Sequence, residues 1–140
     1  MALSTGLGVA TSNPASASKS ASAVNGYCEA IADPVQIGFG LVTGTGHSNC
    51  QGVGGVWFGD MLTVVICIQK QTGFFPFYHF ELLACTEPVT EPWPVIGNAI
   101  QTPILGGYHT YRIRTHVYGF YHHEHVDIYG HSAVRGYDPD

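Results

Sequence analysis

Residues 110–134 read TYRIRTHVYGFYHHEHVDIYGHSAV and contain two stretches in which apolar and polar side chains alternate. Alternation with a period of two is typical of a β-strand that has one face in the core and the other face outside. The pattern predicts two long strands, over residues 108–120 and 123–134, joined by a two-residue turn at Tyr121-His122. This turn contains neither Gly nor Asn, the residues that tight hairpin turns prefer.

The register of this hairpin decides which side chains share a face. A turn at Tyr121-His122 places Val117 opposite Val126 and His116 opposite Asp127. The inner face is then mostly apolar and consists of Tyr111, Ile113, Thr115, Val117, Val126, Ile128, Gly130 and Val134. The outer face carries cationic, aromatic and imidazole side chains: Arg112, Arg114, His116, Tyr118, His123, His125, Asp127, Tyr129 and His131.

The rest of the chain carries further strand signals and no convincing helical period. Residues 61–69, MLTVVICIQ, are apolar on both faces and predict a central strand. Shorter strand signals lie at residues 35–42, 56–58 and 74–85, a Gly-rich stretch covers residues 44–55, and the Pro-rich residues 86–103 predict a long loop anchored by Trp93. Together these signals predict an all-β fold, an antiparallel β-sandwich of about six to eight strands.

The four cysteines predict two disulfides. An even number of widely spaced cysteines fits an oxidising compartment, and the lack of a CxxC pair argues against a zinc site. Three pairings are possible, and we favour Cys28–Cys50 with Cys67–Cys85 because each closes a loop of about twenty residues between neighbouring segments. We therefore expect a secreted, extracellular protein.

Composition excludes several function classes. Only 11% of the 140 residues are charged, and the net charge is −5 with five Lys and Arg, so a nucleic-acid partner is not expected. No apolar run reaches the ~18–20 residues of a membrane span. The sequence has no G-x-S-x-G elbow and no phosphate-binding loop. We expect a protein that is not an enzyme and that has no cofactor.

The chain divides into a low-complexity segment, residues 1–26, and a β domain, residues 27–140. The segment is rich in Ala, Ser, Gly and Thr and has one charge, Lys19. Such a composition buries too little apolar surface to order itself. Its small side chains would let the backbone lie along a sheet edge or in the cleft of a partner. It could equally fold onto its own domain. The apolar candidates for partner contact are Leu3, Leu7, Val9 and Val24.

The outer face of the hairpin has three interpretations, which the sequence leaves open. It is a solvated strand surface, a contact for a protein or carbohydrate, or a metal site. The contact residues would be Arg112, Arg114, Tyr118 and Tyr129, because Arg and Tyr combine a large contact area with polar tips. The metal ligands would be His116, His123, His125 and Asp127, since imidazole and carboxylate groups on neighbouring strands can share one ion. A pH-dependent contact is a variant of the second interpretation.

The stretches GFGLVTGTGHSNC, MLTVVICIQ, LLACTEP and TYRIRTHVYGFY, followed by HVDIYGHSAVRG, resemble small secreted proteins of actinomycete bacteria. The resemblance covers residues 27–136 and consists of strands and cysteines without a catalytic motif. Some such proteins are adaptors in secreted antibacterial toxin particles, where an extended N-terminus docks into a partner protein. The resemblance implies the same plan here, with the difference that this hairpin is unusually rich in His.

These observations favour a secreted, non-catalytic interaction or adaptor module that docks to a partner through residues 1–26. Its partners would be proteins, either other subunits of a secreted complex or copies of itself. The alternatives are a metal- or ligand-binding β domain that uses the His-rich hairpin, a secreted protease inhibitor, and a self-assembling filament subunit.

Overall fold

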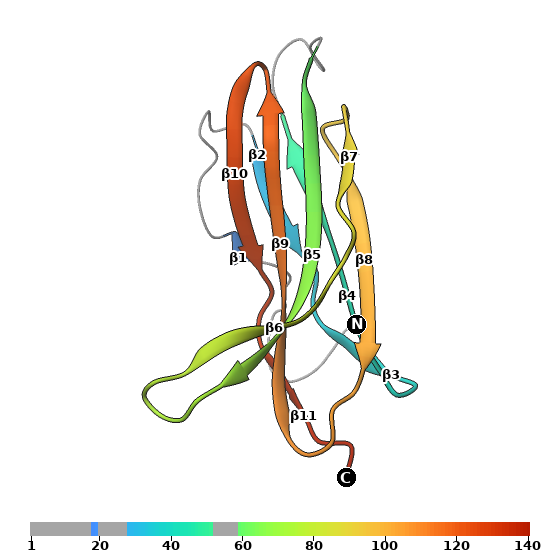
Figure 1. Cartoon of the computed structure of the whole chain (residues 1–140), viewed down its shortest axis with the longest axis vertical. Helices are drawn as coiled ribbons and strands as arrows, with labels where there is room; N and C mark the ends of the chain where they lie inside the picture. Colours follow the sequence, from blue (N-terminus) through green and yellow to red (C-terminus); the bar gives the residue numbers. More distant parts are fainter. Residues whose placement is uncertain (1–17, 20–27, 52–58) are drawn as a thin grey trace.

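The computed structural model describes residues 18–19, 28–51 and 59–140 (Figure 1). These residues form eleven strands and no helix, so none of them belongs to a helix that could cross a membrane. The strands are β1 Ser18–Lys19, β2 Cys28–Ala32, β3 Gln36–Gly38, β4 Leu41–Cys50, β5 Met61–Thr72, β6 His79–Cys85, β7 Val89–Glu91, β8 Gly97–Pro103, β9 His109–Tyr121, β10 Glu124–His131 and β11 Arg135–Tyr137. The predicted all-β fold is confirmed.

The strands form two antiparallel sheets. In the seven-stranded sheet the order is β1-β10-β9-β5-β6, with β11 beside β9 and β7 beside β5. In the four-stranded sheet the order is β2-β4-β3, with β8 on the other edge of β4. Seven strands have five or more residues, which agrees with the predicted six to eight, and the other four have two or three. The inner faces of the two sheets enclose one core, so the fold is a sandwich (Figure 1).

The core lies between β5, β9 and β10 on one side and β2 and β4 on the other. As predicted, β5 is a central strand, because it pairs with β9 on one edge and with β6 and β7 on the other. The predicted inner residues of the hairpin are buried from Tyr111 to Gly130. The largest fully buried apolar side chains are Tyr111, Leu62, Ile66, Ile68, Ile113, Ile128, Val42, Val64, Val117 and Val126.

Residues 44–50 of the Gly-rich stretch belong to a ten-residue strand, β4, whereas residues 52–55 lie outside the described residues. The buried positions of β4 alternate from Val42 through Gly44 and Gly46 to Ser48. A Cβ at Gly44 would overlap the Ile113 side chain, and one at Gly46 would lie 2.8 Å from Cδ1 of Ile66. The glycines therefore let the two sheets approach closely, and their missing side chains hide the strand from an apolar pattern.

The prediction of one long loop over residues 86–103 is wrong, since β7 and β8 both lie in this segment. Among the described residues each of these strands pairs with one neighbour, and of the four prolines only Pro103 lies within a strand, at the end of β8. Trp93 is 57% exposed and does not anchor the segment. Ile96 is buried instead, and its N–H donates to Ser48 Oγ over 2.9 Å.

Both predicted disulfides are confirmed. Cys28–Cys50 joins β2 to β4, and Cys67–Cys85 joins β5 to β6, with sequence separations of 22 and 18. In each case the two cysteines are also register partners across neighbouring strands. Two such bridges are consistent with an oxidising, extracellular environment.

The predicted turn at Tyr121-His122 is wrong by one residue. The turn is His122-His123, and both residues have positive φ, 53° and 63°, as a type I′ turn requires. Tyr121 therefore pairs with Glu124, and Ile128, rather than Val126, lies opposite Val117.

A register change of two residues leaves each strand's faces unchanged. Two other expectations fail. His116 lies opposite Tyr129 instead of Asp127. Val134 is exposed because β10 ends at His131, before the inner face reaches it.

The predicted tail contacts Leu3, Leu7, Val9 and Val24 lie outside the described residues, as do residues 56–58. Within the segment, the structure describes only β1. Its two residues pair with Gly130 and His131 on the edge of β10, so at this point the backbone lies on the edge of its own sheet. The role of the tail in docking stays a prediction.

Candidate functional site

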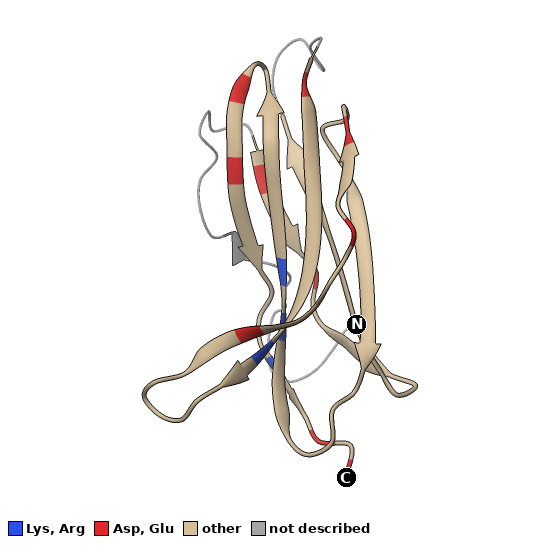
Figure 2. Ribbon diagram, viewed as in Figure 1, with Lys and Arg blue, Asp and Glu red and all other residues tan. Residues whose placement is uncertain are grey.

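The outer face of the seven-stranded sheet brings the predicted contact residues together. We call the "arginine face" the following outward side chains of β5, β6, β9 and β10: Gln69, Phe80, Arg112, Arg114, His116, Tyr118, Tyr129 and His131. Figure 2 shows Lys and Arg gathered around the lower half of β9, whereas most Asp and Glu lie toward the strand ends and the C-terminus. The two arginines of the face, Arg112 and Arg114, therefore lie on β9, between β10 and β5.

Arg112 is held on two sides. Its Nε donates a hydrogen bond of 2.7 Å to Oε1 of Gln69 on β5. The guanidinium carbon lies 3.6 Å from the ring centroid of Phe80 on β6, a cation–π contact. Burial, and then the neighbouring charge of Arg114, lower the pKa of Arg112. Arg112 and Arg114 are two residues apart in β9, so their side chains share one face of the sheet and two like charges are neighbours there.

Arg114 lies over the Cys67–Cys85 disulfide and a tyrosine ring. One terminal nitrogen is 3.7 Å from Sγ of Cys67, and the guanidinium carbon is 5.2 Å from the Tyr129 centroid. Its Nε is buried and has no hydrogen-bond partner among the described residues. No ion pair within the described chain includes Arg112 or Arg114.

Imidazole groups border the two arginines. The His116 ring stacks on Tyr129, with centroids 4.1 Å apart and an interplanar angle of 11°. Its Nε2 lies 2.7 Å from Oδ1 of Asp127, its diagonal neighbour on β10. Burial, and then the charges of Arg112 and Arg114, lower the pKa of His131.

The four predicted metal ligands are not all brought together. His116 and Asp127 are neighbours, but His123 lies in the turn and the His125 ring packs edge-on against Phe120, 5.8 Å between centroids. In the part of the chain that the structure describes, no three His, Cys, Asp or Glu side chains form a group that could hold a metal ion.

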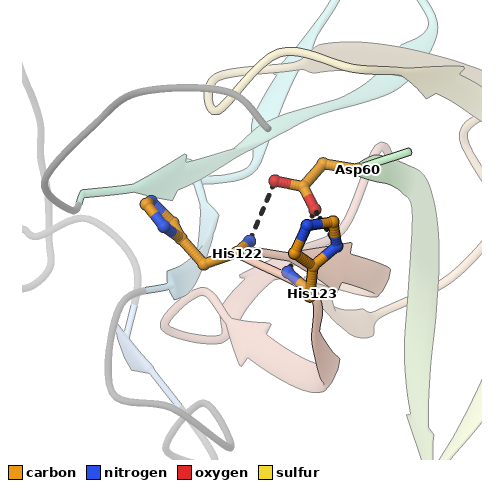
Figure 3. A network of polar contacts seen from close by, with 3 residues as sticks. All are labelled: Asp60, His122 and His123. Carbon is orange, nitrogen blue, oxygen red and sulfur yellow. Dashed lines mark hydrogen bonds and ion pairs between the residues drawn. The ribbon is translucent and has the colours of Figure 1, made fainter. Parts of the chain in front are cut away.

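The turn of this hairpin is fixed by a buried carboxylate that sequence reasoning missed. Asp60 precedes β5 and is almost fully buried. Its two oxygens accept the backbone N–H groups of His122 and His123 over 2.9 and 3.1 Å (Figure 3). Burial, and then the Asp60 charge, raise the pKa of Tyr121. Asp60 thus selects the turn position across more than sixty residues of sequence, which no local pattern reveals.

Replacing Asp60 with Ala is expected to lower the free energy of unfolding by about 1–3 kcal/mol, because two buried N–H donors lose a charged acceptor. Asp60→Asn keeps one amide oxygen and should cost less. Urea unfolding of both variants and the wild type measures the difference. Equal stability of the wild type and Asp60→Ala would contradict this role.

The second candidate surface is the loop between β5 and β6. In the segment Phe74–Tyr78, which we call the aromatic loop, the four aromatic side chains Phe74, Phe75, Phe77 and Tyr78 are 52% to 79% exposed. Figure 1 shows this hairpin projecting away from the two sheets. Apolar side chains gathered at one exposed place mark contact sites in soluble proteins.

The sequence contains a signal for this loop. The run FFPFY at residues 74–78 follows Gly73 and has no polar alternation, which a strand with one solvent face would show. The expectation of a strand over residues 74–85 is wrong for this segment, because β6 begins at His79. Beside the loop, Tyr78, Tyr108 and His109 contribute to an open pocket of about 380 Å³.

The fold and these surfaces define the chain as a disulfide-linked antiparallel β-sandwich with an arginine face and an exposed aromatic loop. No protein-family model, curated protein or solved structure matches it. The chemistry of these two surfaces is therefore the guide to function.

Proposed function

We propose that the chain is a secreted, non-catalytic protein-interaction module of the adaptor type, and that the aromatic loop is its main contact. The observation that carries the proposal is the exposure of four aromatic side chains within five residues. Leaving such rings in water forgoes roughly 1.5–3 kcal/mol for each side chain that a partner could bury. Aromatic anchors of this kind supply much of the affinity of protein interfaces.

The support beneath the loop favours recognition by a preformed surface. The loop extends from β5, the central strand of the larger sheet, and the Cys67–Cys85 bridge joins β5 to β6 at the far end of their ladder. Within the loop, the Phe77 N–H donates to the Phe74 carbonyl over 2.6 Å. A preformed loop loses less conformational entropy on binding than a flexible one.

Residues 1–26 are a second contact in this proposal. The pairing of Ser18–Lys19 with β10 provides a place from which the rest of the segment could reach a partner. The two disulfides support secretion, because such bridges persist in oxidising compartments. The plan resembles that of the secreted adaptor proteins, and the partner would be another subunit of such a complex or a second copy of the chain.

To find the partner, the chain is cross-linked to the secreted and surface proteins of the source organism, and the protein that it captures is identified and purified. Calorimetry then compares the wild type with Phe75→Ser/Phe77→Ser. We expect affinity to fall by about a hundredfold, because two anchor side chains are lost. Trp93→Ser changes a 57% exposed aromatic side chain between β7 and β8; it is the matched control and should bind like the wild type.

Unchanged affinity of the double variant would overturn the role of the aromatic loop. A variant lacking residues 1–26 separates the two contacts, since it should keep its Tm and lose only the affinity that the segment contributes. Sedimentation at increasing concentration completes the experiment. Self-association that disappears in the double variant would identify a second copy as the partner.

A further inference from the structure

We infer that Arg112 and Arg114 form a binding site for carboxylate groups of an acidic protein segment. The inference deepens the proposed function and rests on it, because it assigns a chemistry to part of the partner. It depends on the arginine face, however, and not on the aromatic loop.

Neither arginine has a counter-charge within the described chain. The sequence has ten Asp and Glu against five Lys and Arg, so carboxylates of the same chain outnumber its basic side chains two to one. Lys70 has one, Glu81, at 3.8 Å. Arg112 and Arg114, by contrast, take part in no ion pair among the described residues, although both are partly buried and lie side by side on one face of β9. Partly buried cations that repel each other are stabilised by an anion from outside.

Both arginine side chains are held in place before a partner binds. Arg112 is fixed by Gln69 and Phe80, and Arg114 is fixed by Tyr129 and the disulfide sulfur. These contacts occupy few of the five N–H donors that each guanidinium carries. The buried Nε of Arg114 is one donor without a partner in the described structure. A planar guanidinium group that is already held in place can pair with a carboxylate through two parallel hydrogen bonds, and it loses little conformational entropy in doing so.

Apolar side chains beside the two arginines favour a protein segment as the source of the carboxylates. Leu82 on β6 is an exposed apolar side chain and lies opposite Gln69 of β5. Phe80, also on β6, lies beside Arg112. Asp127 stands at the border of the face and disfavours a dense polyanion. A segment in which Glu or Asp alternates with apolar residues matches this pattern. Phe80 is also only two residues from Tyr78 of the aromatic loop, so one partner could contact both surfaces.

To test the site, the full chain is titrated with the acetylated, amidated peptide Glu-Leu-Glu-Leu-Glu and, separately, with Gln-Leu-Gln-Leu-Gln. NMR measures the affinity of each peptide. We expect the Glu peptide to bind at least tenfold more tightly than the Gln peptide. The pKa of His131, which the two arginines help to lower, should rise when a carboxylate occupies the site. Arg112→Gln and Arg114→Gln should each weaken binding of the Glu peptide about tenfold.

The matched control is Arg135→Gln. Arg135 lies opposite Tyr111, which points into the core, so its side chain starts from the other face of the sheet and donates to the Val35 carbonyl. It should bind the Glu peptide like the wild type. Equal binding of the Glu and Gln peptides, or an equal loss in Arg135→Gln, overturns the site without involving any folding defect.

Chondroitin sulfate and inorganic sulfate are tested as competitors of the Glu peptide, to find out whether the site prefers a sulfated polysaccharide or a small anion. Tighter binding of the polysaccharide than of the Glu peptide would overturn the assignment to a protein segment, and no competition by either supports it. If the peptide fails to bind while Phe75→Ser/Phe77→Ser still loses its partner, the arginine site is wrong and the interaction module stands. If the peptide binds and the aromatic variant keeps its partner, the arginine site stands and the assigned role of the aromatic loop is wrong.

Discussion

Gly119→Ala is expected to lose about 3 kcal/mol or more of unfolding free energy, with a Tm lower by roughly 10 °C. Gly119 has φ 135°, a conformation that side chains rarely adopt. Its Cβ would overlap the carbonyl oxygen of Met61 and lie 3.1 Å from Cα of Leu62. Both neighbours are backbone atoms of β5, so no side-chain movement can relieve the contact, and the central β5–β9 ladder must separate.

The matched control is Gly106→Ala. A Cβ at Gly106 meets nothing within 4 Å and requires no unusual φ. It should change stability by less than about 0.5 kcal/mol. Thermal and urea unfolding of both variants compare the two sites, and similar losses would contradict the proposed close approach at Gly119.

Residues with strict alternation were the predictable part of the fold. In β9, Tyr111, Ile113 and Val117 point into the core as predicted, because one buried face imposes a period of two. In β4 the same alternation exists, but Gly44 and Gly46 occupy the inner positions. The signal that marks a strand is the apolar side chain itself, and close packing of two sheets removes it at this place.

The candidate site shows a similar division. Alternation placed Arg112, Arg114 and Tyr129 on one outer face, and the structure agrees. The neighbours that define their chemistry, Gln69 and Phe80, lie more than thirty residues away in sequence, and their positions depend on how β5 and β6 pair. A single sequence read locally contains no information about such cross-strand contacts, and the same is true of Asp60 and its turn.

Reduction of both disulfides is expected to lower the free energy of unfolding by about 6 kcal/mol. Each bridge stabilises the fold by about 3 kcal/mol, because it closes a loop and so lowers the entropy of the unfolded chain. The loops span 22 and 18 residues. A typical domain has a total stability of about 5–15 kcal/mol, so the reduced protein should be marginal or unfolded at 37 °C. Circular dichroism melts with and without dithiothreitol measure the loss. A Tm that changes by only a few degrees would contradict it and would weaken the case for an oxidising compartment.

Single-bridge variants separate stability from binding. Cys28→Ala/Cys50→Ala and Cys67→Ala/Cys85→Ala should each lose about 3 kcal/mol, because the two loops are of similar length. Only the second pair supports the arginine face, where Arg114 contacts Sγ of Cys67 and the bridge joins β6 to β5. Its removal should therefore also weaken binding of the Glu peptide, whereas removal of the first bridge should not. Equal peptide affinity in the two variants would mean that the arginines are positioned by the ladder of β5, β9 and β10 alone.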